Sequence, residues 1–240
     1  MMENYAARLQ DFKDTLNDLD NRIGDGDHGT NMVRGFTAVV DKWRQGRPTE
    51  LSAMCQDAGM TLLGAVGGAS GPLYGTVFLK LSGAWRGREE IDLVALARGL
   101  EAAYEGLVAR GKATPGDKTM LDAWRPALDR LSLLAAASEN PSPELGNAEG
   151  STLAADPASV GAPEFTTGLP SAVGQVSLAA QSAALATKEQ IARKGRAAYL
   201  GERSRGTCDP GAVSSALFFE EILAATAGRR DRLPWDRSAL

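Results

Sequence analysis

Four aspartates and three glycines are concentrated in the stretch LNDLDNRIGDGDHGTNM, residues 16–32. Asp20, Asp25 and Asp27 place three carboxylates within eight residues. Like charges held this close repel one another unless a cation lies among them, and carboxylate oxygens suit hard cations such as Mg²⁺, Mn²⁺ or Ca²⁺. Glycines permit a tight turn whose free N–H groups can face an anion. The stretch therefore predicts a Mg²⁺–phosphate site, and the alternative is a polar loop with solvated aspartates.

The same stretch holds His28, the only histidine of the chain. This side chain is placed to donate a hydrogen bond to a phosphate or to act as a base, although a lone histidine is more often plain polar structure. Thr30 and Asn31 are good N-caps for a following helix, whose N-terminus is then available to phosphate oxygens.

Three further glycine-rich loops follow, which are GAVGGASGPLYG (64–75), GKATPGDKTM (111–120) and KGRAAYLGERSRGTCDPGA (194–212). Ser70 can donate to an oxygen, and the arginines of the last loop fit phosphate oxygens or form a solvated basic face. Asp117 and Lys118 are interpreted as an exposed ion pair. The chain has neither GxxxxGK[ST] nor a GxGxxG after a strand, so the P-loop and Rossmann interpretations fail.

Composition narrows the class of protein. The 240 residues, 43% hydrophobic and 23% charged, suit one soluble globular domain. The net charge of −4 argues against nucleic acid as a partner. We expect no membrane contact, because there is no long apolar run and no signal peptide. Two cysteines without zinc-type spacing favour a cytoplasmic protein.

Apolar residues recur at helical spacing in eight segments, and no segment alternates with period two. The expected helices are 5–19, 32–43, 51–58, 72–85, 93–107, 120–131, 171–193 and 213–227. We expect Pro72 to start the fourth helix and Gly111 to cap the fifth. The pattern predicts an all-α antiparallel up-and-down bundle, in which alternate loops gather at one end.

Two segments differ from the rest of the single domain, 1–240. Residues 139–170 are rich in proline and glycine and carry acidic but no basic side chains, which predicts a long acidic insertion between helices. It is interpreted as a tolerated insertion, with a lid or a partner-docking segment as the alternative. Residues 228–240 form a basic tail that holds Trp235, which we expect either against the body or exposed for a partner.

Four stretches together resemble a known family: LDNRIGDGDHGTNM, GGASGPLYGT, GKATPGDKTMLDAW and KGRAAYLGERSRGTCDPGA. They are similar to the nucleotide-binding L subunit of dihydroxyacetone kinase and to the equivalent C-terminal domain of single-chain ATP-dependent enzymes. The resemblance covers nearly the whole chain outside the insertion and the tail. It implies an eight-helix antiparallel barrel with a nucleotide, ADP or ATP, at one end.

The resemblance also implies the site residues. Asp20, Asp25 and Asp27 would hold two Mg²⁺ ions that bridge the nucleotide phosphates. The phosphates would be contacted by His28, Gly29, Thr30, Asn31, Ala69 and Ser70. The base and ribose region would be lined by Gly111, Met120, Asp209, Pro210 and Gly211, with Arg196 or Arg203 nearby.

By the same resemblance the chain is a kinase subunit, active only with a partner K subunit whose histidine holds dihydroxyacetone or a related small ketose. A phosphotransferase-system M subunit would recharge resident ADP, whereas an ATP-dependent enzyme would exchange its nucleotide; a homodimer is a further expectation. The chain departs from the family at Thr207, which is usually histidine, and at Arg205, usually small or apolar. The alternatives are a fatty-acid-kinase-type domain and a nucleotide-loaded sensor that binds a transcription regulator.

Overall fold

The structure is a computed structural model that describes residues 1–139, 169–226 and 234–240. Within these ranges the chain forms eight α-helices and three short 3₁₀-helices and no strand, which confirms the predicted all-α class. The α-helices are α1 (Met2–Ile23), α2 (His28–Gly46), α3 (Leu51–Ala65), α4 (Ser70–Ala84), α5 (Leu93–Gly111), α6 (Met120–Glu139), α7 (Leu169–Ala186) and α8 (Pro210–Thr226). The 3₁₀-helices are η1 (Thr187–Glu189), η2 (Arg196–Ser204) and η3 (Arg237–Ala239).

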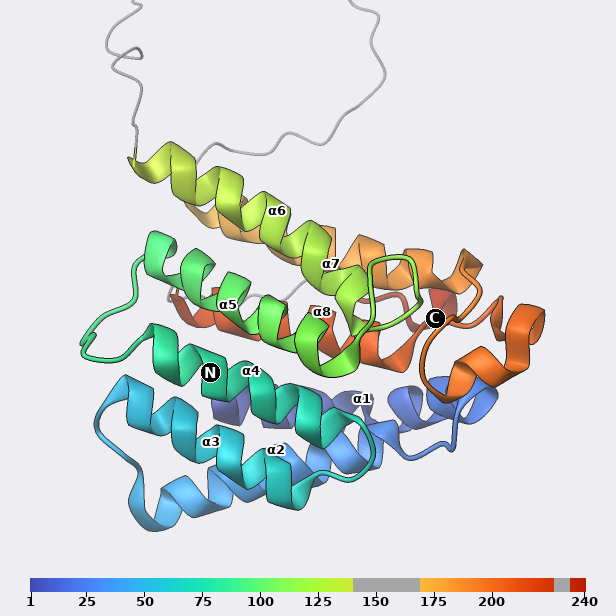
Figure 1. The fold of residues 1–240 in the computed structure, drawn as a ribbon, viewed down its shortest axis with the longest axis horizontal. Helices are drawn as coiled ribbons and strands as arrows, with labels where there is room; N and C mark the ends of the chain where they lie inside the picture. Colours follow the sequence, from blue (N-terminus) through green and yellow to red (C-terminus); the bar gives the residue numbers. More distant parts are fainter. Residues whose placement is uncertain (140–168, 227–233) are drawn as a thin grey trace, which may run out of the picture.

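The α-helices close into a ring (Figure 1). Each α-helix packs against the next one in the chain, and α8 packs against α1 as well as against α6 and α7. Consecutive helices run in opposite directions, so every second loop lies at the same end. As a result, one end of the ring carries the α1–α2, α3–α4, α5–α6 and α7–α8 connections.

Helix α8 is the most enclosed element of the described structure. Every residue from Ala212 to Ala224 is buried, as befits a helix that is largely apolar on all sides. Phe218 is the centre of an aromatic cluster, and the ring centroids of Tyr5, Tyr74, Phe78, Trp124 and Phe219 lie 5.6–6.3 Å from its own. The stripe predicted for the first helix packs against this core, since Tyr5, Leu9, Phe12, Leu16 and Leu19 are all buried.

Several predicted helix ends are wrong. Helix α7 ends at Ala186 instead of Arg193, because the Thr187 hydroxyl donates to the Ala184 carbonyl and accepts from the Asp209 N–H, which fixes a 3₁₀ turn there. Helix α5 is capped by Lys112, whose φ of 49° lies in the left-handed region, and not by Gly111. Helix α4 begins at Ser70, which leaves Pro72 as its third residue.

The N-cap of α2 was also predicted incorrectly. The cap is Asp27, and Thr30 and Asn31 lie inside the helix. The Thr30 N–H donates to the Asn17 side chain of α1, and the Asn17 amide donates back to the Thr30 hydroxyl. This pair of hydrogen bonds joins α1 to α2 beside the aspartate loop. Thr30 therefore binds the neighbouring helix instead of capping its own.

The acidic segment 139–170 lies almost wholly outside the described residues, and its last two residues belong to α7. The tail is described from Pro234 onward. Trp235 packs against the body, with its ring centroid 5.8 Å from that of Phe12. None of the described helices is both long and apolar enough to cross a membrane.

Candidate functional site

The four loops at one end of the ring enclose a cavity of 690 Å³. Its walls come from the aspartate loop, the glycine-rich loop before α4, the loop between α5 and α6, and the segment between α7 and α8. The predicted gathering of these loops is therefore confirmed. The up-and-down order of the helices explains it, because it places alternate loops at the same end.

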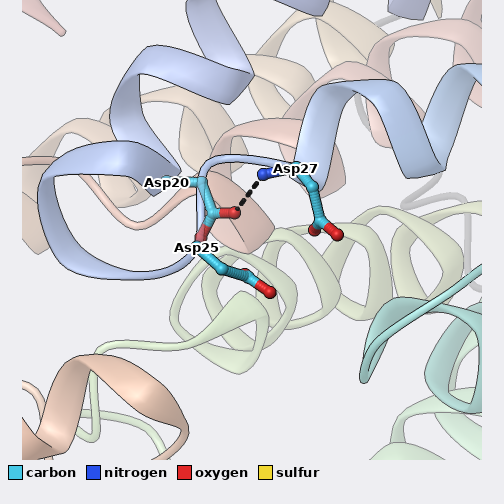
Figure 2. A group of neighbouring side chains, drawn as sticks. All are labelled: Asp20, Asp25 and Asp27. Carbon is cyan, nitrogen blue, oxygen red and sulfur yellow. Dashed lines mark hydrogen bonds between the residues drawn. The ribbon is translucent and has the colours of Figure 1, made fainter.

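Three carboxylates converge on the cavity from the α1–α2 connection. Asp20, Asp25 and Asp27 each offer an oxygen, and these oxygens lie within 4.8 Å of one another (Figure 2). Asp20 is half-buried in the last turn of α1, whereas Asp25 and Asp27 are exposed on the turn that follows. Three oxygen ligands at this spacing fit a hard divalent cation such as Mg²⁺.

Asp20 organises this turn. Its Oδ2 accepts one hydrogen bond from the Asp27 N–H at 2.9 Å (Figure 2) and another from the His28 N–H at 3.1 Å, which satisfies two donors at the start of α2. Desolvation raises the pKa of Asp20 and its neighbours Asp25 and Asp27 add to the rise, while the two backbone hydrogen bonds oppose it. A cation between the carboxylates would relieve the repulsion among them.

His28 lies at the back of the cavity, at the first turn of α2. Its Nδ1 lies 3.1 Å from the Ser70 hydroxyl and its Nε2 lies 3.0 Å from the Ser214 hydroxyl. Burial lowers the pKa of His28 to about 4, so the ring is neutral at pH 7. Because both ring nitrogens have serine partners, the ring joins the aspartate loop to the glycine-rich loop and to α8.

The prediction of an exposed ion pair at Asp117 and Lys118 is wrong. Lys118 is 1% exposed, and its ammonium donates to the carbonyls of Gln190 at 3.1 Å and Ser204 at 2.6 Å. Desolvation lowers its pKa. The Asp117 carboxylate accepts from the Thr114 N–H and hydroxyl instead, which closes a local turn. Lys118 thus holds both ends of the segment that carries η2.

Lys194, Arg196 and Asp209 of the α7–α8 segment line the cavity, and two of them have defined partners. Arg196, at the start of η2, pairs with Asp25 across the cavity at 2.6 Å. Asp209 caps α8 by accepting from the Ala212 N–H, and burial raises its pKa to about 7. The arginine and the aspartate loop therefore meet over the same space that the three carboxylates enclose.

Most of the predicted site residues line the cavity. They are Asp20, Asp25, Asp27, His28, Asn31, Ala69, Ser70, Gly111, Met120, Arg196, Asp209, Pro210 and Gly211. Three others do not. Gly29 is buried where α1 and α2 cross, Thr30 bonds to Asn17, and Arg203 is exposed on η2.

The sequence interpretation missed the apolar part of the wall. This part is formed by Ile23, Leu73, Leu107, Ala113, Leu121 and Ala197, and Arg110 and Lys194 add charge to the lining. Leu107 was visible only as one position of a helical stripe, and nothing in the stripe marked it as a cavity residue. An apolar wall next to a polar end lined by carboxylates suits a ligand with a flat ring and a charged tail.

The two departures from the family pattern lie outside the lining. Thr207 is buried, and Arg205 is exposed and lies 3.5 Å from Glu202. Neither side chain contributes to the cavity wall. The unusual residues at these two positions therefore do not change the lining of the cavity directly.

Comparison with known proteins agrees with this geometry. A family model described as the DAK2 domain matches residues 22–149 and 153–224. The chain is 39% identical over 228 residues to the PEP-dependent dihydroxyacetone kinase ADP-binding subunit DhaL of Escherichia coli, with 93% of this chain and 95% of that protein covered. It is 38% identical over 222 residues to the ADP-binding subunit DhaL of PEP-dependent dihydroxyacetone kinase 1 of Listeria innocua, with 92% of each chain covered.

Solved structures show the same fold. The dihydroxyacetone kinase of C. freundii in its native form superposes with a TM-score of 0.65 at 23% identity, over 93% of this chain and 33% of that one. The same enzyme in complex with AMP-PNP and Mg²⁺ superposes with a TM-score of 0.61 at 25% identity, over the same shares of the two chains. This chain thus corresponds to one third of that longer enzyme. With the family model matched over most of the chain, the protein belongs to the DAK2 domain family.

Proposed function

We propose that this chain is the nucleotide-binding subunit of a dihydroxyacetone kinase or of a related small-ketose kinase. It passes the terminal phosphoryl group of a Mg²⁺-bound nucleotide to a ketose held on a separate subunit. The observation that carries the proposal is the convergence of Asp20, Asp25 and Asp27 on a cavity built from four loops. Relatives named as ADP-binding subunits, matched along nearly their full length, support the same assignment.

The residues suit phosphoryl transfer. This reaction requires positioning and charge neutralisation more than a covalent protein group. The three aspartates would hold one or two Mg²⁺ ions, which supply positive charge to the phosphates. Asp20, whose second oxygen accepts two backbone N–H groups, fixes the turn on which the other two ligands stand. The apolar wall would take the base, and Arg196 lies where it can reach a phosphate oxygen.

The partner is proposed from the family resemblance, which implies that a histidine of a separate K-type subunit holds the ketose covalently. The only histidine of this chain, His28, has serine partners at both ring nitrogens, which agrees with that division of roles. The named relatives are PEP-dependent or PTS-dependent, which favours a phosphotransferase-system M subunit as donor and resident ADP. The chain is also 32% identical to a D-erythrulose kinase, of which it spans 32%. Other small ketoses are therefore alternative substrates.

Calorimetric titration of the purified chain with ADP, with and without Mg²⁺, tests the proposal. We expect Mg²⁺-dependent binding, with slow release if ADP is resident. Phosphoryl transfer to dihydroxyacetone should then need both a K-type subunit and the donor. An absence of ADP binding under both conditions would overturn the assignment.

A further inference from the structure

A chain of buried hydrogen bonds runs from the cavity into the core of the ring. Its members come from α4, α2, α8 and α6 and are, in order, Ser70, His28, Ser214, Tyr74, Ser215 and Trp124. Only the first two and Tyr74 line the cavity. Ser214 is completely buried behind His28, in the second turn of α8. An alanine would fill the same place but would remove a hydroxyl that contacts both His28 and the buried Tyr74 hydroxyl.

One set of hydrogen-bond directions gives each hydrogen of this network a single acceptor, and it begins at Ser214. The Ser214 hydroxyl has one hydrogen, and its oxygen lies 3.1 Å from the Gly211 carbonyl oxygen, which can only accept. With that hydrogen donated to Gly211, the Ser214 oxygen accepts from His28 Nε2 at 3.0 Å. A neutral imidazole carries one N–H, so Nδ1 is bare and accepts from the Ser70 hydroxyl at 3.1 Å.

We propose that Ser214 is a positioning residue of the nucleotide site, which holds His28 in its Nε2–H tautomer so that Nδ1 binds the Ser70 hydroxyl. The inference rests on the proposed function. His28 opens α2 and Ser70 opens α4, so this arrangement joins the two predicted phosphate loops to the start of α8. Loops fixed in advance lose less conformational freedom when the ligand binds.

Ser215 supplies a matched control on the same helix. It is as deeply buried as Ser214, and its hydroxyl contacts Tyr74 and Trp124 but not His28. Ser214→Ala and Ser215→Ala therefore remove the same atom from neighbouring buried sites. Only the first change removes the acceptor for the imidazole N–H.

Because His28 is the only histidine, ¹⁵N-histidine NMR of the untagged full-length chain reports on one ring. At neutral pH the wild type should show a protonated Nε2 and a bare Nδ1. Ser214→Ala should lose this pattern and become a mixture of tautomers, whereas Ser215→Ala should keep it. A wild-type ring with its proton on Nδ1, or an unchanged ring in Ser214→Ala, would overturn the proposal.

The functional arm measures affinity for ADP with Mg²⁺. Ser214→Ala should bind about five- to tenfold more weakly and Ser215→Ala within about twofold of the wild type, given the usual worth of one buried hydrogen bond. Equal losses in both variants would mean that the effect is a general one of the core, and would refute the positioning role. If the wild type binds no ADP, the proposed function fails while the tautomer result still stands.

Ser70→Ala keeps the inference testable should Ser214→Ala not fold. This variant leaves Ser214 in place, and the tautomer should remain Nε2–H because Ser214 determines it. A shift of the proton to Nδ1 in Ser70→Ala would assign the control to Ser70 and contradict the proposal.

Discussion

The ammonium of Lys118 lies 2.6 Å from the carbonyl oxygen of Ser204, and the same ammonium reaches the carbonyl of Gln190 at 3.1 Å. These two carbonyls stand at the two ends of the segment that carries Arg196. One buried cation thus closes the loop that overhangs the cavity. Because the cation is desolvated, its hydrogen bonds to two carbonyls are what keep it there.

Replacing this cation should loosen the overhanging segment. Lys118→Met leaves two carbonyls without their donor and should lower the free energy of unfolding by about 2–4 kcal/mol. Affinity for Mg²⁺–ADP should fall as well, because Arg196 loses its fixed position. Urea unfolding and calorimetry measure the two effects. Lys80→Met, on an exposed face of α4, is the control and should change neither.

The carboxylate cluster makes a prediction about metal dependence. Asp25→Asn removes one anionic ligand and should weaken Mg²⁺-dependent nucleotide binding by at least about tenfold, while helicity measured by circular dichroism is unchanged. The fold should survive because Asp25 is exposed on the turn, where it pairs with the exposed Arg196. Asp129→Asn, which breaks a surface pair with Arg125 at 2.9 Å, should do little. Unfolding of Asp25→Asn would show that the loop is structural.

Asp209 should make stability depend on pH. Its folded pKa of about 7 lies above the ordinary value of 3.8, so the folded state binds the proton more tightly than the unfolded state does. Protonated Asp209 makes its full contribution to the free energy of unfolding below about pH 4. This contribution is lost as the pH rises through about 7, and the total loss is at most about 4 kcal/mol.

Asp209→Asn removes this titratable group and should make the free energy of unfolding nearly independent of pH between about pH 4 and 7. The amide oxygen can still accept from the Ala212 N–H, so the helix cap is retained. Urea unfolding between pH 4 and 8 compares the two proteins. The variant should match the wild type near pH 4 and exceed it at pH 8. Parallel profiles would show that Asp209 does not titrate in this range.

Gly29 makes a prediction about helix packing. A Cβ at Gly29 would lie 2.1 Å from the Lys13 carbonyl oxygen, and this backbone atom of α1 cannot move aside cheaply. Gly29→Ala should therefore destabilise the fold by about 2–4 kcal/mol. Gly64→Ala in α3, where nothing lies within 4 Å of the added methyl, should be neutral or stabilise by up to about 1 kcal/mol. Thermal unfolding of both variants decides the point, and equal melting temperatures would contradict it.

The helical class and the location of the site were determined by local sequence. Apolar residues at helical spacing specify which face of each segment is buried, so the eight helices could be predicted one at a time, and their order predicted that alternate loops share one end. Asp20, Asp25 and Asp27 lie close in the chain, and a glycine-rich turn can bring them together only in a small space. These features depend on contacts between near neighbours in the sequence, which periodicity and residue type report directly.

Contacts between distant segments were decided only by the tertiary structure. Lys118 looked like a surface lysine because its partners, two backbone carbonyls, lie more than 70 residues away and backbone atoms leave no signature in the sequence. The end of α7 at Ala186 depends on Thr187 meeting the backbone of Asp209. Ser214 became visible as the partner of His28 only when the fold brought the first residue of α2 to the second turn of α8. A hydrogen bond selects its partner by position in space, and the periodicity of a helix records only which face is buried.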